Sequence, residues 1–249
     1  MFEILEFIQF TNPYLIVGFG LLMGLIHAFE PDHISAISTQ LLNKKNSNFS
    51  KQTNLKKISI RSSLRGMFWG MGHTSSILFV GLLIAGFSLS ISSVFFLGAE
   101  LIVGLMLISL AIVTILNKNI LKLNHVHPHQ HGDEIHTHPH THDSGHKHNH
   151  KSYLIGCIHG LAGSGSVVIL ATSSLNNFES VLFFLTLFGI GSIIGMSTIS
   201  GLLGIPFALI SNISKITIYL RYVIAAVAFG VGIFIVYNMI SNISNFGLN

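Results

Sequence analysis

The stretch that decides the fold is "GLIHAFEPDHISAI", residues 24–37, which places two histidines, an aspartate, a glutamate and a proline inside a long apolar run. Only 9% of the 249 residues are charged, half are hydrophobic, and the mean hydropathy is +0.66. A soluble domain carries about a quarter charged residues, so this composition predicts a membrane protein. Ionisable groups inside a membrane span cost about 3 kcal/mol each on insertion scales and usually face a cavity or a partner.

Six apolar segments along the chain are long enough to cross a bilayer, which takes about 20 residues. They are residues 14–42, 65–90, 93–117, 153–175, 178–205 and 217–241. We therefore expect an all-α polytopic membrane protein with six transmembrane helices, the first of them broken near Pro31.

The basic residues predict how these helices are oriented. All thirteen lysines and arginines lie in or beside the connections 43–64, 118–152 and 206–216. The positive-inside rule places these connections in the cytoplasm. Both termini then lie on the outer side of the cytoplasmic membrane. Because the basic excess is accounted for by topology, we expect no nucleic-acid partner.

An internal repeat divides the chain at its histidine-rich connection. "GLIHAFEPDHIS" from Gly24 aligns with "GCIHGLAGSGSV" from Gly156, at an offset of 132 residues. Each half then holds three spans, so the halves insert with opposite orientation, as in many secondary transporters. We expect a first repeat over 1–117, a disordered cytoplasmic loop over 118–152 and a second repeat over 153–249.

Pro31 explains how the polar residues of the first span could act together. On an unbroken helix, Asp32 and His33 would lie about 140° and 240° around the axis from His27. Proline lacks an N–H and clashes with the carbonyl of His27, four residues earlier, which breaks the helix. A broken helix can turn His27, Asp32 and His33 to one side, toward a cavity.

Two imidazoles and a carboxylate suit a divalent transition metal such as Ni²⁺, Co²⁺ or Zn²⁺, whereas Mg²⁺ and Ca²⁺ favour oxygen-only sites. His73 in "GMGHTSS" of the second span and His159, the repeat equivalent of His27, are the other candidate ligands. The alternative for each histidine is an interhelical hydrogen bond. Met196 and Glu100 are weaker candidates, since packing and an interfacial position explain them equally well.

These motifs resemble the nickel/cobalt transporter (NiCoT) family. "HAFEPDH" matches its H-x₄-D-H signature, "GHTSSI" is similar to its second-helix segment, and "HGLAGSG" and "FGIGSIIGMS" are similar to the second half of its six-span, urease-accessory-type nickel permeases. The resemblance implies metal-binding roles for His27, Asp32, His33 and His73, and transport of Ni²⁺ or Co²⁺. Ser200 stands where eight-span members carry an acid, so the preference among Ni²⁺, Co²⁺ and Zn²⁺ stays open.

Residues 125–150 contain eleven histidines among 26 positions. This composition is typical of a disordered segment that chelates metal without a fixed geometry. Such a loop could accept imported metal, sense excess metal, or collect metal for export.

The expected function is a secondary transporter for uptake, because Pro31-Asp32-His33 is similar to the uptake branch, whereas efflux relatives tend to read Pro-Gly-His. Efflux and metal sensing or storage are the alternatives, and a transporter of organic solutes is a third. We expect no enzyme, since the H-E-x-x-H motif of zinc metalloproteases is absent. We expect no cofactor; the partners are the metal ion and the lipid bilayer, with cytoplasmic metallochaperones as candidates.

Overall fold

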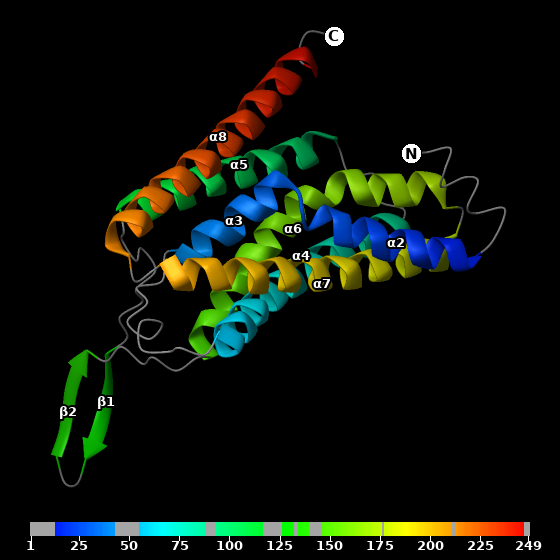
Figure 1. Cartoon of the computed structure of the whole chain (residues 1–249). Helices are drawn as coiled ribbons and strands as arrows, with labels where there is room; N and C mark the ends of the chain where they lie inside the picture. The colour runs from blue at the N-terminus through cyan, green and yellow to red at the C-terminus, as the bar shows by residue number, and fades with distance from the viewer. Residues whose placement is uncertain are drawn as a thin grey trace.

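The computed structural model of the chain describes residues 13–42, 55–87, 93–116, 126–131, 134–139, 146–175, 177–210 and 213–246. Seven helices and one hairpin lie in this part of the chain (Figure 1). The helices are α2 (Pro13–His27), α3 (Pro31–Leu42), α4 (Leu55–Phe87), α5 (Ser93–Leu116), α6 (His146–Ser174), α7 (Phe178–Ile210) and α8 (Ser214–Phe246).

Each of the six predicted apolar segments coincides with helix, and the first coincides with the pair α2 and α3. Among the described residues, four helical stretches are long and apolar enough to cross a membrane: Leu55–Phe87, Leu97–Leu116, Phe178–Ile210 and Lys215–Ser241. A shorter apolar helix covers Gly18–His27. The fold is therefore that of a multi-pass membrane protein, and the crossing of the bilayer by all six segments stays a prediction.

The chain breaks between α2 and α3 where the proline predicts it. The Glu30 N–H donates to the His27 carbonyl at 3.1 Å, and the Phe29 N–H donates to the Ile26 carbonyl at 2.9 Å, so the last turn of α2 tightens. Pro31 has no N–H to offer and its fixed φ suits the first position of a new helix. Helix α3 accordingly starts at Pro31, and the Ile34 N–H donates to the Glu30 carbonyl at 3.0 Å.

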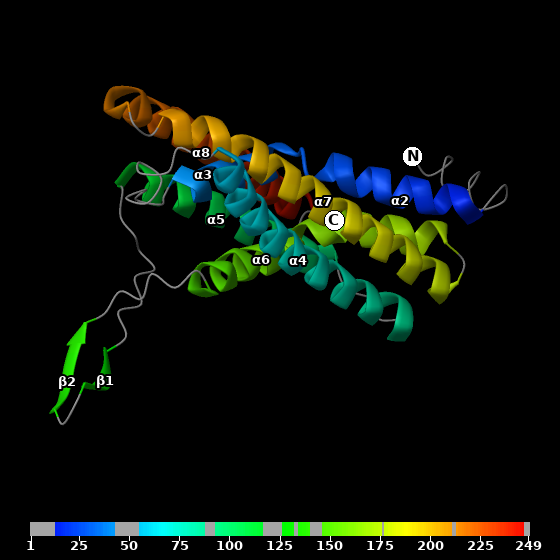
Figure 2. The same ribbon diagram turned by 60° about the horizontal axis from the view of Figure 1, so that its bottom comes forward.

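The helices pack in four main pairs, which include partners far apart in sequence. Helices α4 and α7 lie along each other at the centre, α2 lies on α7, and α6 lies on α4 (Figures 1 and 2). Helices α5 and α8 form a further pair, which contacts the body through α3 and α6.

Glycines let the central helices approach closely. A Cβ added at Gly24 would come nearer than 3.0 Å to the backbone of Phe188 in α7, and one added at Gly156 would do the same to Trp69 in α4. Real Cβ atoms do not make such contacts, so both crossings need glycine. Small residues at helix crossings are the usual basis of helix association in membranes.

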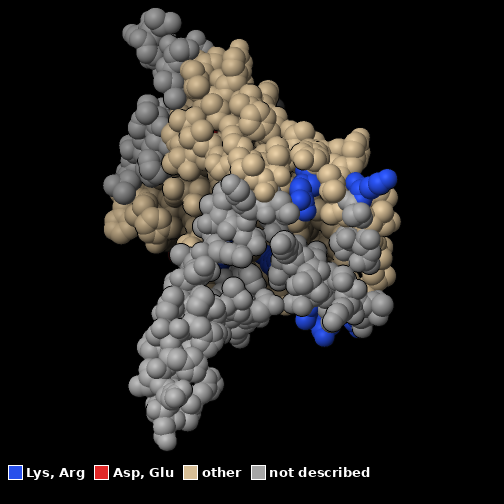
Figure 3. All heavy atoms as spheres, turned by 90° about the vertical axis from the view of Figure 1, so that its left-hand side faces the viewer, with Lys and Arg blue, Asp and Glu red and all other residues tan. Residues whose placement is uncertain are grey.

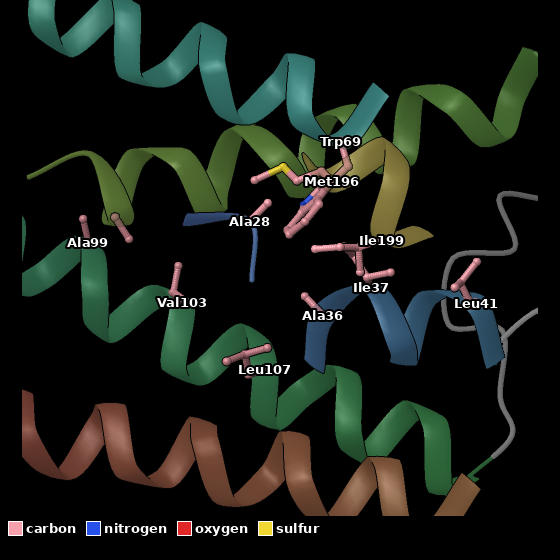
Figure 4. Close-up of a cluster of buried hydrophobic side chains, with 11 residues drawn as sticks. Ala28, Ala36, Ile37, Leu41, Trp69, Ala99, Val103, Leu107, Met196 and Ile199 are labelled. Atoms are coloured by element: carbon pink, nitrogen blue, oxygen red, sulfur yellow. The ribbon is translucent and has the colours of Figure 1, made fainter. Parts of the chain in front are cut away.

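Two large apolar clusters hold this arrangement together. One joins α4, α6 and α7 around Phe184 and Phe188. The other brings Ala28, Trp69 and Met196 together with residues of α3 and α5 (Figure 4). The break between α2 and α3 lies between these clusters, because Ala28 belongs to the second cluster and the His27 ring lies 5.2 Å from the Phe188 ring.

Part of the histidine-rich connection forms a hairpin. Strands β1 (Val126–His131) and β2 (Glu134–Pro139) pair antiparallel, with His127 opposite His138 and His129 opposite His136. This hairpin extends away from the helical body (Figure 1). Residues 1–12, 43–54 and 117–125 lie outside the described residues.

Candidate metal site

The break between α2 and α3 places three polar side chains together. His27 is the last residue of α2, and Asp32 and His33 lie in the first turn of α3. The rings of His27 and His33 have centroids 4.4 Å apart. Because the two helices do not share one continuous axis, the sequence prediction that Pro31 turns these side chains to one side is consistent with the geometry.

His73 and His159 reach the same place from two further helices. Helix α4 carries His73 and helix α6 carries His159, both near the helix middle, and both rings are fully buried. A Cβ added at Gly160 would come nearer than 3.0 Å to the backbone of His73. This glycine therefore allows α6 to approach α4 at the level of the two histidines.

All five side chains predicted as metal ligands form one buried cluster. The ring of His33 lies at its centre, with centroids 4.4 Å from His27, 5.1 Å from His73 and 4.4 Å from His159. The chain has fifteen histidines, eleven of them between residues 125 and 150. The remaining four histidines all belong to this cluster.

Two carboxylates fix how the imidazoles are oriented. Asp32 accepts hydrogen bonds from His33 Nδ1 at 3.0 Å and from His159 Nε2 at 2.8 Å. Glu30 contacts His27 Nδ1 at 2.8 Å. Because a carboxylate only accepts, each of these histidines uses one ring nitrogen as a donor and keeps a lone pair on the other. A carboxylate behind the imidazole is the usual arrangement around metal-binding histidines.

Three buried ring nitrogens in the cluster have no hydrogen-bond partner: His33 Nε2, His73 Nδ1 and His159 Nδ1. An unpaired buried polar atom costs about 1–3 kcal/mol, so its retention needs a reason. With His27 Nε2 placed 3.2 Å from His73 Nε2, the alternative of interhelical hydrogen bonds accounts for part of the cluster. It leaves these three nitrogens unexplained.

The side chains form two groups that could each hold a metal ion. The first consists of His27, His33 and His73, and the second of Asp32, His33 and His159. Within each group one nitrogen or oxygen atom per residue lies within 4.8 Å of the others. Imidazoles with at most one carboxylate suit Ni²⁺, Co²⁺ or Zn²⁺ better than Mg²⁺ or Ca²⁺.

Sequence reasoning missed two residues beside the cluster. Glu30 was not assigned a role from the sequence, which left open whether it contacts the metal, and it is the partner of His27. The Trp69 ring, one helical turn before His73, lies 5.4 Å from both His33 and His159. The four-residue spacing of Trp69 and His73 was the available signal, since it places both on one face of a helix.

The two weaker candidates lie elsewhere. Met196 is fully buried in the apolar cluster of Figure 4, which agrees with a packing role. Glu100 lies in α5, a helix that contributes no side chain to either group of possible ligands among the described residues.

Fold and site together define a multi-pass membrane protein with a largely buried cluster of histidine and aspartate side chains that could hold a metal ion. The chain is 36% identical over 198 residues to the urease accessory protein UreH of Bacillus sp. (strain TB-90), an alignment that covers 78% of each chain. The protein therefore belongs to the family of this urease accessory protein. No protein-family model matches the sequence. No solved structure matches it either.

Proposed function

We propose that the protein is a secondary transporter that carries Ni²⁺, or Co²⁺, through the His/Asp cluster into the cytoplasm. The observation that carries this proposal is the convergence of four histidines and an aspartate from four helices of a membrane protein. Polar groups inside membrane-spanning helices are costly, and in membrane proteins they mark ion pathways and substrate sites. No nucleotide-binding motif occurs in the sequence, so the membrane potential or ion exchange is the simplest driving force.

The ends of α2 and α3 support a substrate site at this point. Transporters commonly bind ions where a discontinuous helix presents its half-helix ends near the middle of the membrane. Here the carboxylate of Asp32 lies at the positive end of α3 and the imidazole of His27 at the negative end of α2. The helix dipole of α3 favours the carboxylate, and that of α2 would favour a cation bound at His27.

The packing of the helices supports the inverted repeat. Gly24 and Gly156 are the aligned glycines of the two halves. Each lies against a helix of the opposite half: Gly24 lies against α7, and Gly156 lies against α4. Helix α2 thus packs across the repeat boundary, as does α6. This exchange of partners is expected when two halves are related by a pseudo-twofold axis.

The relationship to a urease accessory protein favours nickel as the transported metal, because urease is a nickel enzyme. The donor set agrees, since imidazole suits nickel and cobalt as well as zinc. We assign the family accordingly to the urease-accessory-type branch of the nickel/cobalt transporters.

The distribution of basic residues supports a cytoplasmic position for one end of the molecule. The lysine and arginine side chains that the structure describes lie in the N-terminal parts of α4, α6 and α8, and they gather on the end shown in Figure 3. The N-terminal parts of these three helices directly follow the connections that the positive-inside rule places in the cytoplasm. A negative-inside potential then favours entry of a dication, by about 2.3 kcal/mol per charge per 100 mV.

Efflux is the second candidate, because a cytoplasmic histidine-rich loop could also collect metal for export. The Asp-His pair after Pro31 favours uptake over this alternative. A sensor or storage protein would use the loop and would have no need of ligands within the helices.

The test is ⁶³Ni²⁺ flux into proteoliposomes of known orientation under an imposed potential, for the wild type and for His27→Ala. Ser192→Ala is the matched control, because Ser192 is fully buried in α7 and bonds only its own helix, at Phe188 O. Inward flux that His27→Ala abolishes and Ser192→Ala keeps is the expected result. Flux outward only would support efflux instead. Absence of flux in either direction with Ni²⁺, Co²⁺ and Zn²⁺ would refute transport.

A further inference from the structure

We infer that the cluster is two overlapping metal positions, and that the ion crosses the site by passing from one to the other while His33 stays bound. This inference rests on the proposed transport function and describes how the same site would work. The first position is formed by His27, His33 and His73, the second by Asp32, His33 and His159.

His33 is the one residue that belongs to both groups. Its ring is fully buried and lies 4.4 Å, centroid to centroid, from both His27 and His159. His73 and His159 lie farther apart, at 6.1 Å. The cluster is therefore extended, with His33 in the middle, and its five side chains do not surround a single point equally.

The two positions differ in charge. The first consists of three imidazoles, with Glu30 behind His27 and Asp32 behind His33. The second includes the carboxylate of Asp32 among its own ligands, so an ion there replaces the hydrogen bonds that Asp32 accepts from His33 and His159. A dication gains more Coulomb energy from a direct carboxylate than from one placed behind an imidazole. The second position is therefore the more negative of the two.

Each position has one ligand at its outer edge. The side chains of His27 and Asp32 are 8% and 21% exposed, whereas the rings of His33, His73 and His159 are fully buried. Phe188 lies 5.2 Å from His27, and Trp69 lies 5.4 Å from His159, so an aromatic ring lines each position. Apolar walls limit water, so an ion that leaves one position depends on protein ligands to replace those it loses.

Ligand exchange around His33 meets this need. His27 and His73 leave the ion as Asp32 and His159 bind, and His33 is a ligand before and after the exchange. The alternative, a single site with five ligands, would hold the ion tightly and give it no intermediate on the way out.

Equilibrium ⁶³Ni²⁺ binding to the purified full-length protein tests the inference. The eleven histidines between residues 125 and 150 are first replaced by serine, so that the loop adds no background. In this parent we expect His27→Ala and His159→Ala each to keep one bound ion, with Kd raised about tenfold, because one position stays complete. His33→Ala damages both positions, and we expect its Kd to rise at least about 100-fold. All three variants are expected to lose flux.

X-ray absorption gives an independent readout. Nickel in His159→Ala should show imidazole ligands alone, and nickel in His27→Ala should show imidazole together with carboxylate. His159→Gln and His27→Gln repeat the comparison with side chains larger than alanine. Ser192→Ala controls for loss of binding through misfolding.

Equal weakening by His27→Ala, His33→Ala and His159→Ala, with flux intact in the parent, would overturn the two-position inference and leave transport standing. A parent that neither binds nor transports nickel would overturn both. The double variant His27→Ala/His159→Ala should lose binding; if it keeps the ion, the inference is also wrong.

Discussion

At the scale of single residues, Asp32 has the most demanding position in the cluster. Its two carboxylate oxygens accept hydrogen bonds from two different histidines, His33 and His159. It therefore orients both imidazoles and supplies negative charge near a bound dication. No other described side chain of the site does both.

Replacing Asp32 by asparagine tests this role. The amide keeps the size of the side chain but offers one acceptor oxygen in place of two, and it removes the charge. We expect Asp32→Asn to reduce ⁶³Ni²⁺ flux about 100-fold. Flux equal to that of the wild type would show that the carboxylate is dispensable.

Glu30 is a positioning residue, since it acts through His27. Because a neutral glutamine still offers an acceptor oxygen to His27 Nδ1, we expect Glu30→Gln to retain most of the flux. Glu30→Ala should raise the nickel KM about tenfold. If Glu30 were itself a metal ligand, glutamine would fail about as badly as alanine, and KM measurements on both variants separate these roles.

At the scale of helices, the crossing of α4 and α6 determines whether His73 and His159 meet. Gly160 lies against the backbone of His73, and even one methyl group has no room there. The crossing therefore couples packing directly to the geometry of the site.

We expect Gly160→Ala to destabilise the protein by about 1–3 kcal/mol, as overpacking does, and to reduce nickel affinity as well. Gly98→Ala in α5 is the matched control, because a Cβ at Gly98 meets nothing within 4 Å. Thermal unfolding in detergent and nickel binding measure the two effects. A Gly160→Ala protein as stable as the Gly98→Ala control would contradict the close approach.

The helix break and the cluster were predictable because they follow from local rules. Pro31 cannot continue a helix, and the repeat offset between His27 and His159 identified a ligand candidate on a distant helix. The pairing of Glu30 with His27 was not predictable in this way, since it depends on the tightened turn at the end of α2. The position of Trp69 depends on how α4 and α6 cross, which periodicity alone does not determine. The backbone pairing of β1 and β2 was not among the sequence predictions.

At the scale of the whole molecule, orientation is the main prediction still to test. With Cys157 replaced by serine, single cysteines can be placed in the connections 43–54 and 118–125 and next to the C-terminus. We expect membrane-impermeant thiol reagents to label only the C-terminal cysteine in intact cells, and the other two only after lysis. The reverse pattern would invert the topology.

The histidine-rich connection should affect metal retention more than transport. Serine in place of its eleven histidines is expected to leave the initial rate of flux within about twofold of the wild type, because the cluster is intact. Metal bound by the connection should be lost as the pH falls, since imidazole binds metal only when neutral. Retention measured on wild type and serine variant at two pH values checks both statements.

The chain contains a single tryptophan, and that residue is Trp69, whose ring lies 5.4 Å from His33 and His159. The protein thus carries its own optical reporter beside the cluster. Open-shell Ni²⁺ or Co²⁺ bound there would quench the indole emission, whereas closed-shell Zn²⁺ would not. Arrival and departure of the ion can therefore be timed in the unlabelled wild-type protein, by stopped-flow fluorescence.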